Sequence, residues 1–218
     1  MQEQPVIISI QKLNHDGRGE GPFNDKNGIE YQAEVPFTVP GDKVEALVKR
    51  KRGGVYPGRL LQVVEPAKGA VSARCVHFGK CGGCLFQRLS YEEQLAWKEQ
   101  KVRSLFPNVQ SGPIIGCTPP WAYRNKMEFT FSQDAKGEKF LGMMLAGSRG
   151  RVFELTECHL VSPWFASTLA EVRRWWNASS ISAYFPPRNS GSLRTLTLRE
   201  SATTGARLAM LTLSGNPE

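Results

Sequence analysis

The pattern of apolar and polar positions divides the chain into short strands and two helices. Between residues 5 and 65, short apolar runs alternate with polar positions and are separated by turns that contain glycine or proline. Strands are predicted at 6–13, 43–51 and 55–64, and Gly53 and Gly54 are expected to form the hairpin turn between the last two. Short strands at regular spacing are typical of a small β-barrel, which is predicted for residues 1–66.

Two segments carry helix signals. Ser90 is followed three residues later by Glu93, which is the spacing of a capping box, and Pro107 ends the segment. A second helix is expected after Ser162, because Pro163 suits the first helical position. The first helix places four apolar residues on one face: Tyr91, Leu95, Val102 and Leu105.

The remaining strands are expected in the second half of the chain. They are predicted at 126–131, 140–145, 151–155, 193–199 and 207–213. Residues 67–89 and 112–218 are therefore predicted to form a second domain of the α+β class. Residues 90–111 are set apart from it as a separate helix, so the fold class is mainly β with an α+β part.

Four cysteines are the strongest chemical signal. Cys75, Cys81 and Cys84 lie within ten residues, and Cys158 follows far along the chain. Three thiols so close together cannot all pair as disulfides, but they can converge on zinc or on an iron–sulfur cluster. Structural zinc sites usually combine two hooks of the C-x2-C type, and here only Cys81 and Cys84 form one. The spacing therefore favours a 4Fe–4S cluster completed by a distant cysteine, with zinc as the alternative.

Other residues near the cysteines have simpler interpretations. His77 could act as a metal ligand, but a hydrogen-bonding role or an RNA contact is favoured, and the same holds for His159. Cys117 has no partner at metal-ligand spacing. It is predicted to be a small buried apolar residue, as cysteines outside metal sites often are.

Charge indicates a nucleic-acid partner. The chain has 28 lysine and arginine residues against 20 acidic ones, a net charge of +8 and a pI near 9.4. No apolar stretch approaches the ~20 residues of a membrane span, and the N-terminus lacks the features of a secretory signal. Clustered thiols without such a signal predict a reducing, cytoplasmic location. Neither a membrane nor a DNA partner is expected.

Two basic segments are candidates for the RNA contact. Lys49-Arg-Lys-Arg52 is a charge run at the end of a predicted strand, and a solvated hairpin tip is its alternative interpretation. Arg124 and Lys126 lie in Tyr123-Arg-Asn-Lys-Met-Glu-Phe-Thr-Phe131, where cations alternate with aromatic rings. Phe129 and Phe131 alternate as core residues of a strand do, so a packing role is favoured for both.

Three motifs together resemble a known enzyme family. They are Cys75-Val-His-Phe-Gly-Lys-Cys-Gly-Gly-Cys-Leu-Phe-Gln87, Tyr123-Arg-Asn-Lys-Met-Glu-Phe129 and Glu157-Cys158, in that order. In this order the chain resembles the iron–sulfur-containing RNA (uracil-5-)-methyltransferases, which make 5-methyluridine in rRNA or tRNA. Residues 5–65 resemble their TRAM domain, an OB-like RNA-binding barrel, through His15-Asp-Gly-Arg-Gly-Glu-Gly21 and Val39-Pro-Gly-Asp-Lys-Val44.

The resemblance implies a 4Fe–4S cluster held by Cys75, Cys81, Cys84 and Cys158. It also implies a fold of TRAM barrel, α+β iron–sulfur central domain and Rossmann-like catalytic domain, with helix 90–106 packed on the last. The catalytic domain, its S-adenosylmethionine site, its nucleophilic cysteine and its glutamate base are expected beyond residue 218 and hence absent here. No catalytic residue is therefore predicted in this chain.

The function implied is that of the RNA-binding, cluster-bearing N-terminal part of an S-adenosylmethionine-dependent uridine C5-methyltransferase, with rRNA favoured over tRNA. A separate catalytic half is a further candidate partner. The alternatives are a stand-alone RNA-binding module and a zinc-stabilised structural protein. The residues predicted to contact RNA are Arg18, Lys49, Arg50, Lys51, Arg52, Arg59, His77, Phe78, Arg124 and Lys126.

Overall fold

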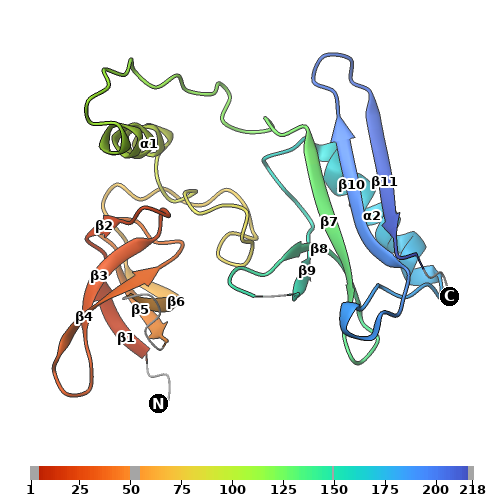
Figure 1. Ribbon diagram of the computed structural model, residues 1–218, viewed down its shortest axis with the longest axis horizontal. Coiled ribbons are helices and arrows are strands. Elements are labelled where there is room, and N and C mark those ends of the chain that lie inside the picture. The colour runs from red at the N-terminus through yellow and green to blue at the C-terminus, as the bar shows by residue number, and fades with distance from the viewer. Residues whose placement is uncertain (1–4, 50–54, 149, 216–218) are drawn as a thin grey trace. The chain divides into compact units, whose positions relative to one another are not determined.

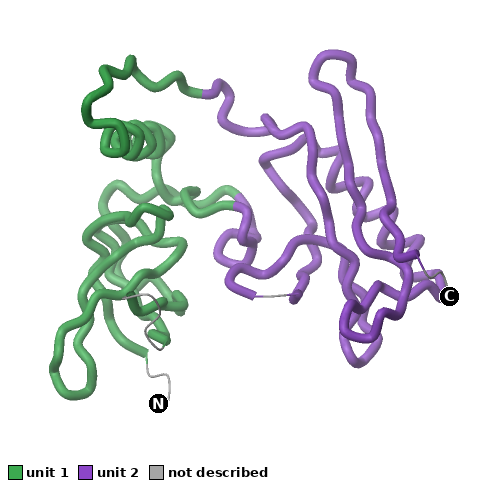
Figure 2. The backbone as a smooth tube through the Cα atoms, viewed as in Figure 1, with its two compact units in different colours: residues 1–74, 84–116 green, residues 75–83, 117–218 purple. Residues whose placement is uncertain are grey.

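The computed structural model describes residues 5–49, 55–148 and 150–215, and the chain forms two compact units (Figure 2). Unit 1 contains residues 1–74 and 84–116, and unit 2 contains residues 75–83 and 117–218. The predicted turn at Gly53 and Gly54 lies outside the described residues. No helix within the described ranges is long and apolar enough to span a membrane.

Unit 1 is built on a six-stranded sheet with the order β1-β5-β6-β4-β3-β2 (Figure 1). Neighbouring strands are antiparallel except β4 and β6, which are parallel. Its strands are β1 (Pro5–Ser9), β2 (Lys12–Leu13), β3 (Gly19–Asn24), β4 (Glu30–Val35), β5 (Lys43–Val48) and β6 (Tyr56–Glu65). Alternate apolar side chains form the core of this sheet: Ile8, Ile10, Phe23, Ala33, Val35, Val44 and Ala46.

The sheet of unit 1 curls until β1 and β3 lie against each other. A Cβ atom added to Gly21 on β3 would come within 2.1 Å of the Ser9 backbone oxygen at the end of β1. A glycine is needed at this position because the two backbones leave no space for a side chain.

Helix α1 (Tyr91–Leu105) begins as the sequence predicts. Ser90 N–H donates to Glu93 Oε2 at 2.9 Å, and Glu93 N–H donates to Ser90 Oγ at 3.2 Å, which completes the capping box. None of its side chains is buried, and Val102 and Leu105 on its predicted apolar face are 49% and 58% exposed. Helix α1 contacts the rest of unit 1 through Lys101, whose Nζ donates to the backbone oxygen of His15 at 2.7 Å.

A buried aspartate joins the sheet of unit 1 to the segment before α1. The Asp42 side chain is fully buried, and its carboxylate accepts two hydrogen bonds from the guanidinium of Arg88. Asp42 Oδ2 also accepts from Val39 N–H at 2.9 Å, and Oδ1 accepts from Ala67 N–H at 3.0 Å. The charge of this carboxylate is therefore satisfied entirely inside unit 1.

Replacing Asp42 by asparagine is expected to lower the free energy of unfolding of unit 1 by about 2–3 kcal/mol. The amide nitrogen would face N–H donors, and Arg88 would lose its counter-charge. Urea denaturation followed by circular dichroism measures the change. Asp16→Asn is the control, because the side chain of Asp16 is 63% exposed and a near-neutral effect is expected there. Equal midpoints for both variants would contradict the role of Asp42.

Unit 2 is built on a five-stranded antiparallel sheet with the order β11-β10-β7-β8-β9. Its strands are β7 (Lys126–Gln133), β8 (Lys139–Met144), β9 (Val152–Glu154), β10 (Leu193–Glu200) and β11 (Arg207–Leu213). Helix α2 (Pro163–Ala178) starts with proline after Ser162, as predicted, and a short 3-10 helix covers Pro186–Arg188.

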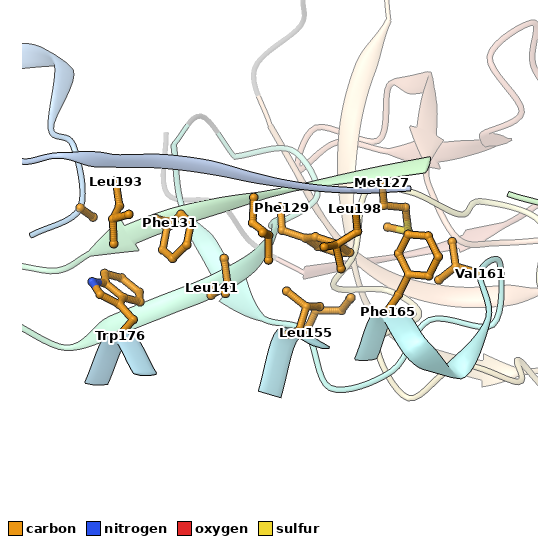
Figure 3. Packing of buried hydrophobic residues seen from close by; sticks show 13 residues of the cluster. Met127, Phe129, Phe131, Leu141, Leu155, Val161, Phe165, Trp176, Leu193 and Leu198 are labelled. Atoms are coloured by element: carbon orange, nitrogen blue, oxygen red, sulfur yellow. The ribbon is translucent and has the colours of Figure 1, made fainter. Parts of the chain in front are cut away.

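The core of unit 2 lies between its sheet and α2 (Figure 3). Phe129 and Phe131 are 0% and 2% exposed, so the packing role predicted for them is confirmed. They meet Phe165, Leu169 and Trp176 from the helix in one apolar cluster. The alternation along β7 therefore sends its rings into the core rather than toward a nucleic acid.

The predicted fold class is wrong. It set a β-barrel beside an α+β domain, whereas the structure is a mainly-β fold of two sheets with two α-helices in its described ranges. The prediction overestimated the helical part of the second domain, because most connections between strands in both units are turns or irregular segments. Helix α1 buries no residue, and α2 alone packs on the sheet of unit 2.

Candidate cysteine-rich site and nucleic-acid interface

The segment that carries Cys75 and Cys81 folds into consecutive tight turns. Phe78 N–H donates to the Cys75 backbone oxygen at 3.1 Å, and Cys81 N–H donates to the His77 backbone oxygen at 2.9 Å. Ala146 N–H then donates to the Lys80 backbone oxygen at 2.7 Å, just after β8. These bonds hold the loop on unit 2 although the sequence around it belongs to unit 1.

A second set of bonds joins this loop to the segment that carries Cys158. Val76 N–H donates to Glu157 Oε1 at 2.8 Å. Val76 follows Cys75 and Glu157 precedes Cys158, so this one bond links the residues beside two of the predicted ligands. The sequence alone gives no signal for it, because the partners are 81 residues apart.

His77 strengthens the same junction. The residue is only 9% exposed, and its Nε2 accepts from Thr156 N–H at 3.0 Å, with Thr156 Oγ1 also at 3.0 Å. Burial lowers the pKa of His77, and the resulting neutral ring can accept that bond. The structure therefore shows His77 in a hydrogen-bonding role, one of the two that the sequence favours, and its RNA contact stays a prediction.

Glu157 carries the negative charge of the junction. The hydrogen bond from Val76 N–H is the main cause that lowers the pKa of Glu157, and nearby His159 adds to it, with Nε2 at 3.3 Å from Oε1. The carboxylate is thus held ionised where the two cysteine-bearing segments meet. His159 thus contacts the carboxylate of Glu157.

The chemistry of the thiols fits a metal, but their arrangement is not that of a formed site. No disulfide joins any two cysteines in the described ranges, and Gly83 N–H donates to Cys81 Sγ at 3.4 Å, the kind of bond that sulfur ligands accept. Within those ranges, no three histidine, cysteine, aspartate or glutamate side chains gather where they could hold an ion. Cys84 belongs to unit 1, whereas Cys75, Cys81 and Cys158 belong to unit 2. The ligand assignment stays a prediction.

Cys117 differs from its predicted environment. It was expected to be a small buried residue, but it is exposed, and its Sγ lies 3.3 Å from the backbone oxygen of Pro119. The segment around it lies outside both sheets, so no core surrounds the thiol.

The predicted RNA contacts are divided between the units. In unit 1, Lys49 and Arg59 are exposed near the paired ends of β5 and β6, whereas Arg18 donates to Glu34 Oε1 at 2.5 Å. In unit 2, Arg124 and Lys126 are exposed at the start of β7, and Phe78 is half-buried. The predicted contacts Arg50, Lys51 and Arg52 lie outside the described residues.

The sequence did not identify a groove in unit 1. It has a volume of about 950 Å³ and lies between turns of the sheet and one side of α1. Lys12, Lys68, Trp97 and Lys101 line it, and none of them is among the predicted RNA contacts. The residues come from three distant parts of the sequence, so no local pattern could reveal them.

Comparison with known proteins gives the chain its relatives. No protein-family model matches it. A protein of Protochlamydia amoebophila named an uncharacterized RNA methyltransferase is 48% identical over 190 residues, which are 85% of this chain and 43% of that protein. A Clostridium acetobutylicum protein of the same description is 32% identical over 208 residues, or 93% of this chain and 44% of that protein. The chain is similar to proteins named RNA methyltransferases. It spans less than half the length of these relatives.

A solved structure has the same fold. The crystal structure of Pyrococcus abyssi tRNA (uracil-54, C5)-methyltransferase in complex with S-adenosyl-L-homocysteine matches with a TM-score of 0.70 and 23% identity. The match covers 97% of this chain and 47% of that one. The fold class predicted from the sequence was a barrel beside an α+β domain, with a Rossmann-like catalytic domain absent. This match supports its correction. The mainly-β fold of two sheets is one that occurs within a solved tRNA methyltransferase.

Proposed function

We propose that this chain binds and positions RNA for an S-adenosylmethionine-dependent methyltransferase that modifies uridine at C5. The observation that carries the proposal is the 48% identity, over 85% of the chain, to a protein named an RNA methyltransferase. The likeness in fold to a tRNA uracil methyltransferase supports the uridine substrate. The net charge of +8 supports a polyanionic partner. The RNA proposed is rRNA, with tRNA as the alternative.

In this proposal the part played by the chain is recognition. Exposed cations neutralise phosphates, and Lys49, Arg59, Arg124 and Lys126 are exposed in the structure. Arg18 is a weaker candidate because Glu34 already balances its charge. S-adenosylmethionine would supply the methyl group, and the residues of this chain would hold the RNA in place for that transfer.

We further propose that Cys75, Cys81, Cys84 and Cys158 hold a 4Fe–4S cluster. The soft thiolate donors suit iron and sulfide, and the bond from Val76 to Glu157 brings together the segments of Cys75 and Cys158. When bound, such a cluster would add folding free energy by tying the loop 75–83 to a segment far along the chain. The function proposed for it is structural.

An RNA-binding experiment tests the function. The anaerobically purified chain is titrated into labelled rRNA and tRNA transcripts at several salt concentrations. We expect binding that weakens as salt rises and that falls several-fold in the double variant Arg124→Ala and Lys126→Ala, since phosphate contacts act on all sequences alike. The control is Lys136→Ala, an exposed lysine in the turn after β7. Wild-type affinity no higher than that of a neutral protein would refute the proposal.

A further inference from the structure

The groove of unit 1 has fixed walls. On one side Lys101 Nζ donates to the backbone oxygen of His15 at 2.7 Å, which ties α1 to the turn before β3. Beneath that turn, Phe86 lies directly on Gly17: a Cβ atom there would come within 2.4 Å of the ring. The groove is therefore formed before any ligand arrives, which lowers the entropic cost of binding.

The charge of the groove is positive. Among the residues that the structure describes, three lysines line it, Lys12, Lys68 and Lys101, against a single carboxylate, Glu93. Glu93 is engaged in the capping box, where it accepts from Ser90 N–H. Lys68 is exposed. The Lys12 side chain is 71% exposed, and its Nζ lies 3.4 Å from Glu20 Oε2, so Lys68 is the stronger candidate for a phosphate contact. A hollow lined in this way attracts phosphates.

An aromatic ring completes the groove. Trp97 packs against Phe86 with ring centroids 5.0 Å apart, and Lys101 Nζ lies 5.2 Å from the centre of the indole. The ring is only half-buried and lines the groove. A fixed aromatic ring among cations is the arrangement on which proteins stack bases of single-stranded nucleic acids.

We propose that this groove binds single-stranded RNA, with Lys12 and Lys68 on the phosphates and Trp97 against one unstacked base. The proposal rests on the RNA-binding function proposed above and assigns it a place that the sequence did not indicate. It commits to an RNA strand, and not to a free nucleotide, because the groove of about 950 Å³ is lined by lysines from three separate segments together with an aromatic ring.

The test uses the full chain and a labelled oligouridine of about 12 nucleotides, within the usual range of such sites. At low salt, Lys68→Glu is expected to weaken binding about tenfold and to reduce the slope of log affinity against log salt by about 0.7. Lys26→Glu is the matched control, because it makes the same charge change at an exposed turn of the same unit. The oligonucleotide is also expected to quench tryptophan fluorescence in the wild type and not in Trp97→Phe.

Three outcomes would overturn the groove proposal. They are equal effects of Lys68→Glu and Lys26→Glu, quenching that persists in Trp97→Phe, and full displacement of the oligonucleotide by uridine monophosphate. If transcripts still bind the wild type in the first two cases, the proposed function stands and only the groove fails. If the wild type binds no RNA, both proposals fail.

Discussion

Replacing Cys81 by serine is expected to remove most of the iron from the anaerobically purified chain and to abolish its visible absorption. Serine is a poor ligand for iron in a cluster built on thiolates, and the loss of one ligand exposes the others. Because metal binding of this kind contributes directly to folding, the variant should also unfold at lower temperature. Iron and sulfide assays, an absorption spectrum and thermal denaturation measure these effects, and about four irons per chain are expected in the wild type.

Cys117→Ser is the matched control for this experiment. It removes one thiol from the same chain, but Cys117 is exposed and lies outside the three motifs. It should keep its iron and its melting temperature. A colourless wild type that carries one zinc ion, or a Cys117→Ser variant that loses its colour, would refute the ligand assignment.

Replacing Trp176 by alanine is expected to lower the free energy of unfolding of unit 2 by about 3–5 kcal/mol. Trp176 is fully buried at the end of α2 and meets Phe131 edge-on with ring centroids 5.0 Å apart (Figure 3). Its Nε1 donates to the Ile181 backbone oxygen at 2.8 Å. The truncation would leave both a cavity and an unpaired carbonyl.

The preceding residue gives the control for Trp176. Trp175 is on the same helix but is 45% exposed, so Trp175→Ala should change stability by less than about 1 kcal/mol. Chemical denaturation followed by near-ultraviolet circular dichroism compares the two variants. Similar losses in both would contradict the assignment of Trp176 to the core.

Local features of the fold could be predicted from the sequence. The capping box of Ser90 and Glu93 is formed by residues three positions apart, and Pro163 marks the start of α2 by its own geometry. The last strand occupies Arg207–Leu213, which are the predicted bounds. The first two features depend on neighbours in the sequence, and the last strand pairs with β10, which comes just before it in the chain.

Features that depend on distant contacts could not be predicted. Alternation in the strands is compatible with a barrel, a curled sheet or an open sheet, and thus did not fix the fold class. The apolar face of α1 did not show how the helix contacts unit 1: Val102 and Leu105, on the face expected to pack on a catalytic domain, are exposed. Likewise, nothing local relates Lys101 to His15, which is 86 residues away, and the sequence therefore did not indicate the groove that both residues line.

The bond between Val76 and Glu157 has a consequence for synthesis of the chain. The two residues are 81 positions apart, so a ribosome that adds about 5–20 residues per second needs roughly 4–16 s to reach the second after the first. Cys75, Cys81 and Cys84 all emerge before this bond can form. For those seconds the nascent loop is open, and its thiols are accessible to oxidants and metal ions in the surrounding cell.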